Sequence, residues 1–211
     1  MKALLAHLHA PIYEERLRVL CELILPHLRD GDRVLDVGCG GGALGARLRS
    51  EAATRGLKVE VNGLERSPRG GEPINVTSYD GGRFPFSDQA FDVVIVADVL
   101  HHEAQPDALL RECVRVSSRN LVIKDHQLSG PLAKMRVSLI DWAANAGYGV
   151  PCLYRYNDHR EWRLALQHLG PLVEERTSLN VYPIGINAVL GRRLHYFAVI
   201  GRPSHVAKTT N

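Results

Sequence analysis

The segment Val34-Leu35-Asp36-Val37-Gly38-Cys39-Gly40-Gly41-Gly42 decides the fold of this chain. Its first four residues predict a buried strand, and four of the next five are glycine. Glycine is favoured where φ is positive and where the main chain must touch a ligand with no Cβ in the way. Residues 43–55 then predict a helix, whose first N–H groups would point over the loop. This arrangement predicts a nucleotide-type pocket at the carboxyl end of a parallel strand.

Acidic residues near the loop indicate which kind of nucleotide-type ligand could bind there. Asp36 lies on the strand itself, where a carboxylate can meet a cationic or amine-bearing ligand. Glu65 ends the next apolar strand, where an acid can accept hydrogen bonds from both hydroxyls of a ribose. The spacing Gly38-x-Gly40-x-x-Ala43 also fits the dinucleotide fingerprint. The loop by itself therefore leaves a dinucleotide-dependent oxidoreductase open, and also a tight turn that binds nothing.

Two further motifs follow the glycine loop, Asp80 … Phe84-Pro85-Phe86 … Phe91-Asp92 and Val99-Leu100-His101-His102. With them the combination resembles the class I S-adenosylmethionine-dependent methyltransferases that act on small molecules. The stretch 80–92 resembles the D-x-x-x-L-P-F-…-F-D pattern of that family, with Phe84 in place of the usual Leu. Val99-Leu100-His101-His102 resembles its LHH segment, and VLDVGCGGG resembles its glycine loop. The resemblance covers residues 30–126. A nicotinamide dehydrogenase would share the loop and the acid, but not Asp80 or the FPF…FD pattern.

The resemblance implies S-adenosylmethionine as the cofactor and assigns residues to its parts. Asp36 and the loop 38–42 would hold the methionine part, Glu65 the ribose, and Asp80 with Gly81 the edge of the adenine. Asp98 would lie beside the methionine part or the acceptor. The complete set of expected cofactor-binding residues is Asp36, Gly38, Cys39, Gly40, Glu65, Arg66, Asp80, Gly81, Asp98 and Val99.

Apolar runs and helical patterns alternate along the chain. Strands are expected at 33–37, 59–64, 74–77, 92–97, 120–125, 172–179 and 194–201, and helices at 12–28, 43–55 and 106–116. This alternation predicts an α/β fold with a doubly wound, mostly parallel seven-stranded sheet, the Rossmann-like methyltransferase fold. No clear helix separates the last two strands, so they should form an antiparallel hairpin at the C-terminal edge. We expect 1–211 to be a single domain in which residues 1–30 form a helical cover.

Residues 129–169 form the least generic part and predict a helical lid inserted after the fifth strand. One helical face carries an apolar stripe expected to be core: Leu128, Leu132, Met135, Leu139, Trp142 and Ala146. A turn-rich, tyrosine-rich stretch follows, and Asn157 or Asp158 should cap a helix that runs to Leu169. An insert here would lie above the carboxyl ends of the central strands, where ligands bind. The expected acceptor-facing residues are Asp141, Trp142, Asn145, Tyr148, Tyr154 and Tyr156.

The candidate catalytic residues follow the fourth and fifth strands. A general base matters where the acceptor must lose a proton. His126 is our first choice for this base, and Asp98 and Asp125 are candidate orienters. Of His101 and His102, one is expected to pack inward and support the loop. The complete candidate catalytic set is His126, His101, His102 and Asp125. No H-x-x-x-H spacing occurs in this cluster, so we predict no metal site.

The composition of the 211 residues excludes several other classes of function. The net charge is +3 and no run of Lys and Arg occurs, so no nucleic-acid partner is expected. No apolar stretch approaches the roughly 18 residues that would predict a membrane span. Four widely spaced cysteines and an N-terminus without a long apolar core predict a cytoplasmic protein. We therefore expect a methyltransferase with a small-molecule acceptor. The alternatives are an oxidoreductase and a catalytically inactive nucleotide-binding partner protein.

Overall fold

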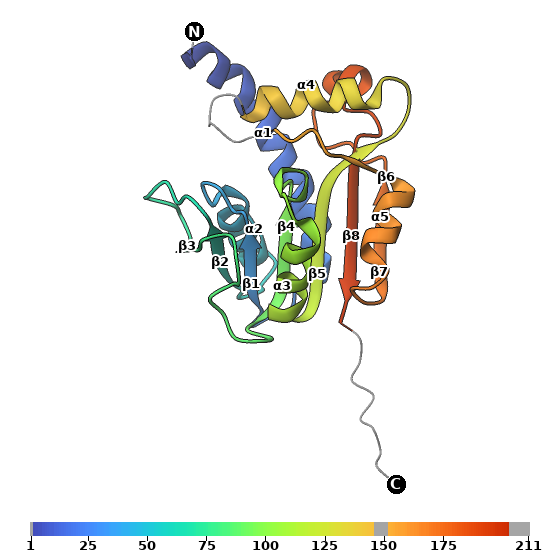
Figure 1. Cartoon of the computed structure of the whole chain (residues 1–211). Coiled ribbons are helices and arrows are strands. Elements are labelled where there is room, and N and C mark those ends of the chain that lie inside the picture. The colour runs from blue at the N-terminus through green and yellow to red at the C-terminus, as the bar shows by residue number, and fades with distance from the viewer. Residues whose placement is uncertain (1, 146–151, 203–211) are drawn as a thin grey trace.

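One sheet organises the chain in the computed structural model (Figure 1), which describes the backbone of residues 2–145 and 152–202. Side chains are described for residues 11–143 and 152–202. The strand order is β3-β2-β1-β4-β5-β8-β7, and a short β6 pairs with β5 outside this path. The strands are β1 (Arg33–Val37), β2 (Glu60–Glu65), β3 (Asn75–Ser78), β4 (Phe91–Ala97), β5 (Ser117–Leu128), β6 (Asn157–Asp158), β7 (Leu172–Thr177) and β8 (His195–Gly201).

The directions of the strands confirm the predicted fold class. Strands β1 to β5 run parallel to one another, and β8 runs antiparallel to both β5 and β7. Each predicted strand has a counterpart, although β5 is longer than expected at both ends. The sheet is therefore doubly wound and mostly parallel, with an antiparallel C-terminal hairpin.

Helices cover both faces of the sheet. Side chains of α1 (Lys2–Ile24) and α2 (Ala43–Thr54) pack with one face, and those of α3 (Pro106–Val116) and α5 (His159–Leu166) with the other. In β1, Val34 faces the first pair of helices, while Leu35 and Val37 face the second. A strand buried on both faces needs a nearly continuous apolar run, which explains why the sequence pattern located β1 so well. Within the described residues, no helix has the length and apolarity needed to cross a membrane.

Two helix boundaries differ from the sequence prediction. Helix α1 begins ten residues before the expected start at 12, includes Pro11, and is followed by the 3-10 turn η1 (Leu25–His27). Helix α5 ends at Leu166 rather than Leu169. Its cap is Asp158, which accepts from the Glu161 N–H at 2.8 Å in a reciprocal capping box. A cap of this kind contributes about 0.5–2 kcal/mol to stability.

The connection between β7 and β8 was predicted to lack a clear helix, and this prediction was wrong. It contains α6 (Ile184–Ile186) and the π-helical turn η3 (Asn187–Gly191). The Arg136 guanidinium of α4 (Ala133–Asn145) donates to the Leu190 carbonyl at 3.3 Å and to the Arg192 carbonyl at 3.2 Å. The connection therefore serves as a platform for α4, which lies across one end of the sheet (Figure 1).

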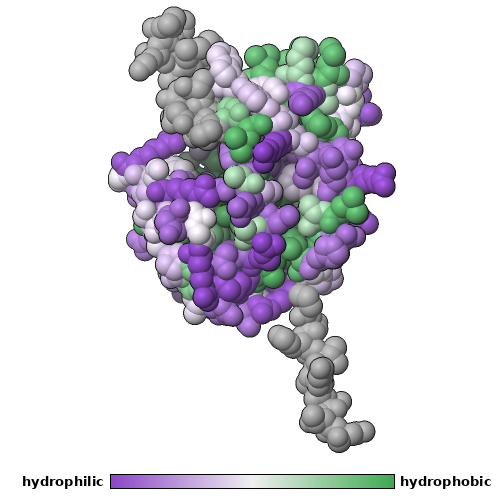
Figure 2. Space-filling model, viewed as in Figure 1, coloured by the Kyte–Doolittle hydropathy of each residue, from purple (hydrophilic) through white to green (hydrophobic). Residues whose placement is uncertain are grey.

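The face that α4 buries also differs from the prediction. Leu132 and Met135 are 68% and 60% exposed, and Leu139 and Trp142 are at least half exposed. The buried positions are instead Ala133, Val137 and Asp141. The predicted stripe was counted from Leu128, but β5 continues through that residue and the helix begins only at Ala133. The outcome is an apolar surface over this end of the molecule, green at the top of Figure 2.

Candidate active site

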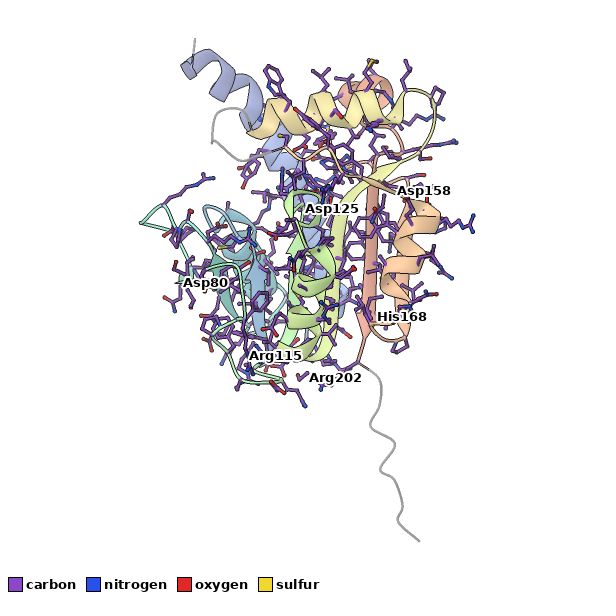
Figure 3. All side chains as sticks on the ribbon, viewed as in Figure 1. Asp80, Arg115, Asp125, Asp158, His168 and Arg202 are labelled. Carbon is purple, nitrogen blue, oxygen red and sulfur yellow. The ribbon has the colours of Figure 1, made fainter. Side chains whose placement is uncertain are left out.

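The predicted site residues gather at the end of the sheet that α4 covers. Figure 3 shows Asp125 beneath α4, and Arg115 and Arg202 at the opposite end of the sheet. Asp80 lies to one side, by β2 and β3 (Figure 3). The carboxyl ends of the parallel strands thus carry two neighbouring groups of residues. One group surrounds the glycine loop, and the other surrounds the 3-10 turn η2 (Leu100–His102).

The glycine loop packs closely against the protein at Gly38 and faces open space at Gly40 and Gly41. A Cβ added to Gly38, where φ is 67°, would lie 2.5 Å from Cγ2 of Val99. A Cβ added to Gly40 or Gly41 would meet nothing closer than the Arg69 guanidinium, at 4.0 and 3.9 Å. The main chain at Gly40 therefore faces space that a ligand can enter.

Cys39 of the loop is a packing residue. A Cβ on Gly63 would lie 2.5 Å from the Cys39 sulfur, so the thiol occupies the space that this glycine leaves. Burial raises the pKa of the Cys39 thiol to about 12, which keeps it protonated at neutral pH. A protonated, half-buried thiol is a poor nucleophile.

Glu65 ties the loop to the end of β2. Its Oε2 accepts from the Gly40 N–H at 2.9 Å, and its Oε1 accepts from the Ser67 N–H at 3.2 Å. Both oxygens are thus oriented by the backbone. A carboxylate has about four lone-pair sites, so it retains capacity for further donors.

Arg66 was predicted to contact the cofactor, and in the structure it links elements of the protein. Its Nη2 donates to the Glu103 carboxylate at 2.7 Å, and its guanidinium lies 5.8 Å from the centre of the Tyr79 ring. A Cβ on Gly81 would lie 2.7 Å from the Arg66 Nε. Asp80 is exposed and accepts from the Gly82 N–H at 2.8 Å. The positive φ of Gly81, 92°, is the feature that favours glycine at this position.

Asp36 is a buried carboxylate at the end of β1. It is 3% exposed, and its Oδ2 has no hydrogen-bond partner among the described residues. Burial raises the pKa of Asp36 to about 7, although the nearby Arg16 partly opposes this shift. An unpaired buried oxygen is costly, and it marks a place where a ligand donor would be stabilising.

Asp98 sits between two cations that the sequence analysis did not identify. Arg16 donates to it through Nε at 2.9 Å and Nη2 at 2.6 Å, and Lys124 Nζ lies 2.5 and 2.7 Å from its two oxygens. Burial disfavours the charged form, but Lys124 and Arg16 outweigh it and hold the pKa of Asp98 well below its usual value.

A sequence signal existed for one of these two cations. Lys124 lies within the apolar run that forms β5, and a lysine in a buried strand needs a buried partner. Arg16 lies 82 residues before Asp98 on a helix rich in charged side chains, and nothing in its local sequence distinguishes it.

The second group of residues centres on His101, the inward-packing member of the histidine pair. His101 is 5% exposed, and its Nδ1 lies 2.5 Å from Oδ1 of Asp125. Asp125 also accepts from the N–H groups of Leu100, at 2.9 Å, and of His126, at 2.6 Å. Because the ionised carboxylate can only accept, Nδ1 of His101 carries a proton. Burial opposes a second proton on His101, but Asp125 outweighs it and raises the pKa to about 10.

His126 packs beside His101 with a different electrostatic balance. The two ring centres are 4.7 Å apart, and Nδ1 of His126 has no hydrogen-bond partner among the described residues. Burial and the neighbouring His101 lower the pKa of His126 to about 4, so its ring is neutral at pH 7. The Trp162 indole donates to the His126 carbonyl at 2.9 Å, which fixes the end of β5.

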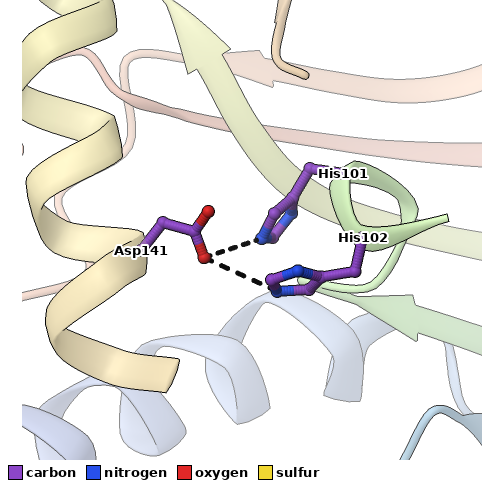
Figure 4. Close-up of side chains that lie close together, drawn as sticks. All are labelled: His101, His102 and Asp141. Atoms are coloured by element: carbon purple, nitrogen blue, oxygen red, sulfur yellow. Dashed lines mark ion pairs between the residues drawn. The ribbon is translucent and has the colours of Figure 1, made fainter. Parts of the chain in front are cut away.

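Asp141 of α4 reaches down to the histidine pair (Figure 4). Its Oδ1 lies 3.5 Å from Nε2 of His101 and 3.6 Å from Nε2 of His102. The Tyr156 hydroxyl donates to its Oδ2 at 2.6 Å. Of the predicted lid residues, Asp141 and Tyr156 therefore face this group.

The other predicted lid residues do not join this group within the described part of the chain. Trp142 is 55% exposed and Tyr154 is 41% exposed, so neither side chain is enclosed. The side chain of Asn145 and the whole of Tyr148 lie outside the described residues.

A cavity of about 250 Å³ lies beside the histidines. Its walls combine polar and aromatic side chains from η2, β5, α3 and α5 with those of the segment before α5. They include His101, Glu103, His126, Arg155, Tyr156 and Trp162.

Two known methyltransferases are similar to this chain in sequence. The chain is 30% identical over 97 residues to the 27-O-demethylrifamycin SV methyltransferase of Amycolatopsis mediterranei, covering 42% of this chain and 36% of that protein. It is 32% identical over 94 residues to the ubiquinone biosynthesis O-methyltransferase of Neisseria meningitidis serogroup A, covering 41% and 40%. The chain thus spans less than half the length of these relatives. They do not favour the oxidoreductase alternative.

Solved structures share the fold over most of the chain. The methyltransferase solved in complex with the Haloferax volcanii Trm112 methyltransferase activator matches with a TM-score of 0.67 at 16% identity, covering 96% of this chain and 94% of that one. Magnesium protoporphyrin IX methyltransferase from Synechocystis, solved with bound S-adenosylhomocysteine, matches with a TM-score of 0.60 at 14% identity, covering 90% and 83%.

A protein-family model shows to which family the chain belongs. The model described as methionine biosynthesis protein MetW matches residues 18–130, more than half of the 211 residues. The matched region contains the glycine loop, the acids of β1 and β2, and the histidine pair. The chain therefore belongs to the MetW family and to the class I S-adenosylmethionine-dependent methyltransferases.

Proposed function

We propose that this chain transfers a methyl group from S-adenosylmethionine to a small-molecule acceptor. The observation that carries the proposal is the group of residues at the ends of β1 and β2. It combines open space beside Gly40, an oxygen of Asp36 with no partner among the described residues, and a carboxylate of Glu65 that the backbone orients. The names of two relatives, the rifamycin and ubiquinone methyltransferases, support a small-molecule acceptor.

The residues of this group fit S-adenosylmethionine. Asp36 offers a buried carboxylate for an ammonium group. Arg16 and Lys124 together carry two positive charges and Asp98 one negative charge, so one positive charge remains for the carboxylate of an amino acid. Glu65 has lone pairs free for the ribose hydroxyls. The bound cofactor supplies a methyl group that is already activated on a sulfonium.

The cavity beside the histidines suits the acceptor. Its volume, about 250 Å³, is below the roughly 300–1,000 Å³ of pockets for drug-sized ligands, which favours a small acceptor group. In this proposal residues 129–169 cover the acceptor, and the chain acts mainly by holding the reacting groups in position. Asp125 is a positioning residue, because it orients the His101 ring and the backbone at His126.

His126 is the proposed general base. Its buried Nδ1 has no partner among the described residues, and the ring lines the cavity. The His126 ring is neutral at pH 7 and can accept the proton of an acceptor hydroxyl, phenol or ammonium group as the methyl group is transferred. Its lowered pKa makes it a weaker base than a free imidazole, so the bound acceptor must be held in position for the transfer.

Methyl transfer and cofactor binding are tested on the purified protein. Transfer from labelled S-adenosylmethionine is followed over a panel of small phenols, carboxylic acids, amines and thiols. Binding of S-adenosylhomocysteine and of NAD is compared by calorimetry. Tight S-adenosylhomocysteine binding with transfer to a panel member supports the proposal. Binding without transfer to any acceptor class would favour the inactive partner protein.

The role of Glu65 gives a sharper prediction. Glu65→Ala leaves ribose hydroxyl donors unpaired, at about 1–3 kcal/mol each, so S-adenosylhomocysteine affinity should fall at least about tenfold. Glu60→Ala is the matched control, because Glu60 is an exposed acid at the other end of the same strand. Equal affinity of the two variants in calorimetry would remove Glu65 from the cofactor site.

A further inference from the structure

The contacts among His101, His102 and Asp141 are unusual for a hydrogen-bonded network. Two imidazole nitrogens approach the same Asp141 oxygen, at 3.5 and 3.6 Å, and the three atoms all lie within 4.8 Å of one another (Figure 4). Ordinary N–H···O hydrogen bonds measure about 2.7–3.2 Å. In a tetrahedral site with metal–ligand bonds of about 2.0–2.1 Å, neighbouring ligand atoms are about 3.3 Å apart. The spacing between these atoms is longer than in ordinary hydrogen bonds and is close to the spacing of ligand atoms around a single ion.

The surrounding residues orient the ligand atoms as in known metal sites. The Nδ1 proton of His101 is donated to Asp125 at 2.5 Å, which turns Nε2 toward Asp141. A carboxylate behind a histidine in this way is the usual support for a metal-bound imidazole. The Tyr156 hydroxyl donates to Oδ2 of Asp141 at 2.6 Å, and so leaves Oδ1 facing the histidines.

The local charge also favours a cation. Asp125 and Asp141 are two carboxylates with exposures of 0% and 1%. The nearby Lys124 and Arg16 are engaged with Asp98. In the ion-free chain a second proton on His101 balances one of these two negative charges. A divalent ion would displace that proton from Nε2 and supply a positive charge for each carboxylate.

From these contacts we propose that His101, His102 and Asp141 bind one divalent transition-metal ion. Two imidazoles and one carboxylate suit Zn²⁺, Co²⁺ or Fe²⁺ better than Mg²⁺ or Ca²⁺, which prefer oxygen ligands throughout. Three protein ligands leave a coordination position open for water or substrate. His101 lines the cavity, so the ion would border the acceptor space. That the open position takes an acceptor oxygen rests on the proposed function, whereas metal binding does not.

The test is a metal titration of the full chain without cofactor or acceptor. Protein stripped with a chelator is titrated with ZnCl₂ by calorimetry and with CoCl₂ by visible absorption. We expect one ion per chain. Loss of an outer carboxylate typically weakens a site about 10–100-fold, so Asp125→Asn should fall in this range and His102→Gln and Asp141→Asn should lose more. His168→Gln is the matched control, an exposed histidine far from the cluster (Figure 3).

Each outcome decides the proposal. A single saturable site that His102→Gln and Asp141→Asn remove and His168→Gln retains supports it. No saturable binding, or equal binding by all the variants, overturns it. Circular dichroism of the metal-free variants checks folding, and His102→Gln is the decisive change because its side chain, 15% exposed, is the least buried of the three ligands. Since the titration contains no cofactor, its result stays separate from any failure of methyl transfer.

Discussion

Asp36 makes the stability of the ligand-free protein depend on pH. Its pKa is about 7 in the folded chain and 3.8 ordinarily, so the folded carboxyl keeps a proton that the unfolded chain releases between these values. Stability from this group is therefore lost as pH rises from about 4 to 7. This rise in the pKa of Asp36 corresponds to at most about 4 kcal/mol. Asp36→Asn should therefore gain stability over the natural chain at pH 8 but not at pH 4.

Urea unfolding of the two proteins at pH 4 and pH 8 measures this difference. The pH dependence of all other groups cancels in the comparison, because both proteins share them. A gain of the same size at both pH values would mean that Asp36 ionises normally in the folded chain.

Replacing His126 should lower turnover if its ring is the general base. His126→Gln keeps a polar side chain of similar size but removes the base, so turnover should fall about 10²–10⁴-fold when the acceptor must lose a proton. S-adenosylhomocysteine affinity should stay within about twofold of the natural chain, since His126 lies with the histidines and not at the glycine loop. His159→Gln, at an exposed histidine, is the control for histidine loss. Full turnover of His126→Gln would leave catalysis to positioning alone.

At the scale of elements, two glycine variants distinguish the effect of backbone strain on stability from the effect of a blocked ligand contact on binding. Gly40→Val places a branched side chain in the open space above the loop and should abolish cofactor binding. Gly56→Val is the matched control, because Gly56 also has positive φ, at 77°, and nothing lies within 4 Å of an added Cβ. Both variants should lose stability, but only Gly40→Val should lose binding in calorimetry. Cofactor affinity retained by Gly40→Val would make the loop purely structural.

The elements differ in how well the sequence predicted them, for physical reasons. Strands such as β1 are buried on both faces and therefore show as continuous apolar runs. The buried face of helix α4 was mispredicted because its most buried side chains, among those described, are Ala133, Val137 and Asp141, while its most apolar stripe faces outward. A periodic pattern indicates that a helix has an apolar side. It does not indicate which side the rest of the chain covers.

At the scale of the whole molecule, the sequence predicted which residues next to a motif lie close together, and it missed contacts between residues far apart in the chain. The position of Glu65 beside the glycine loop could be predicted because Glu65 ends the neighbouring strand. The pairing of Arg16 with Asp98 joins α1 to the end of β4, and that of Asp141 with His101 joins α4 to η2. Such contacts depend on how helices cross the sheet, and no local pattern records them.

Cofactor binding should stabilise the whole molecule. A ligand at about 100 times its Kd stabilises the folded state by about 2.7 kcal/mol, and each kcal/mol raises Tm by about 2–4 °C in a chain of this size. S-adenosylhomocysteine at that concentration should therefore raise Tm by about 5–11 °C in a thermal scan. Glu65→Ala, with a Kd about tenfold higher, should show about half this rise at the same concentration. NAD should leave Tm unchanged. If NAD raises Tm and S-adenosylhomocysteine does not, the site at the glycine loop binds a dinucleotide instead.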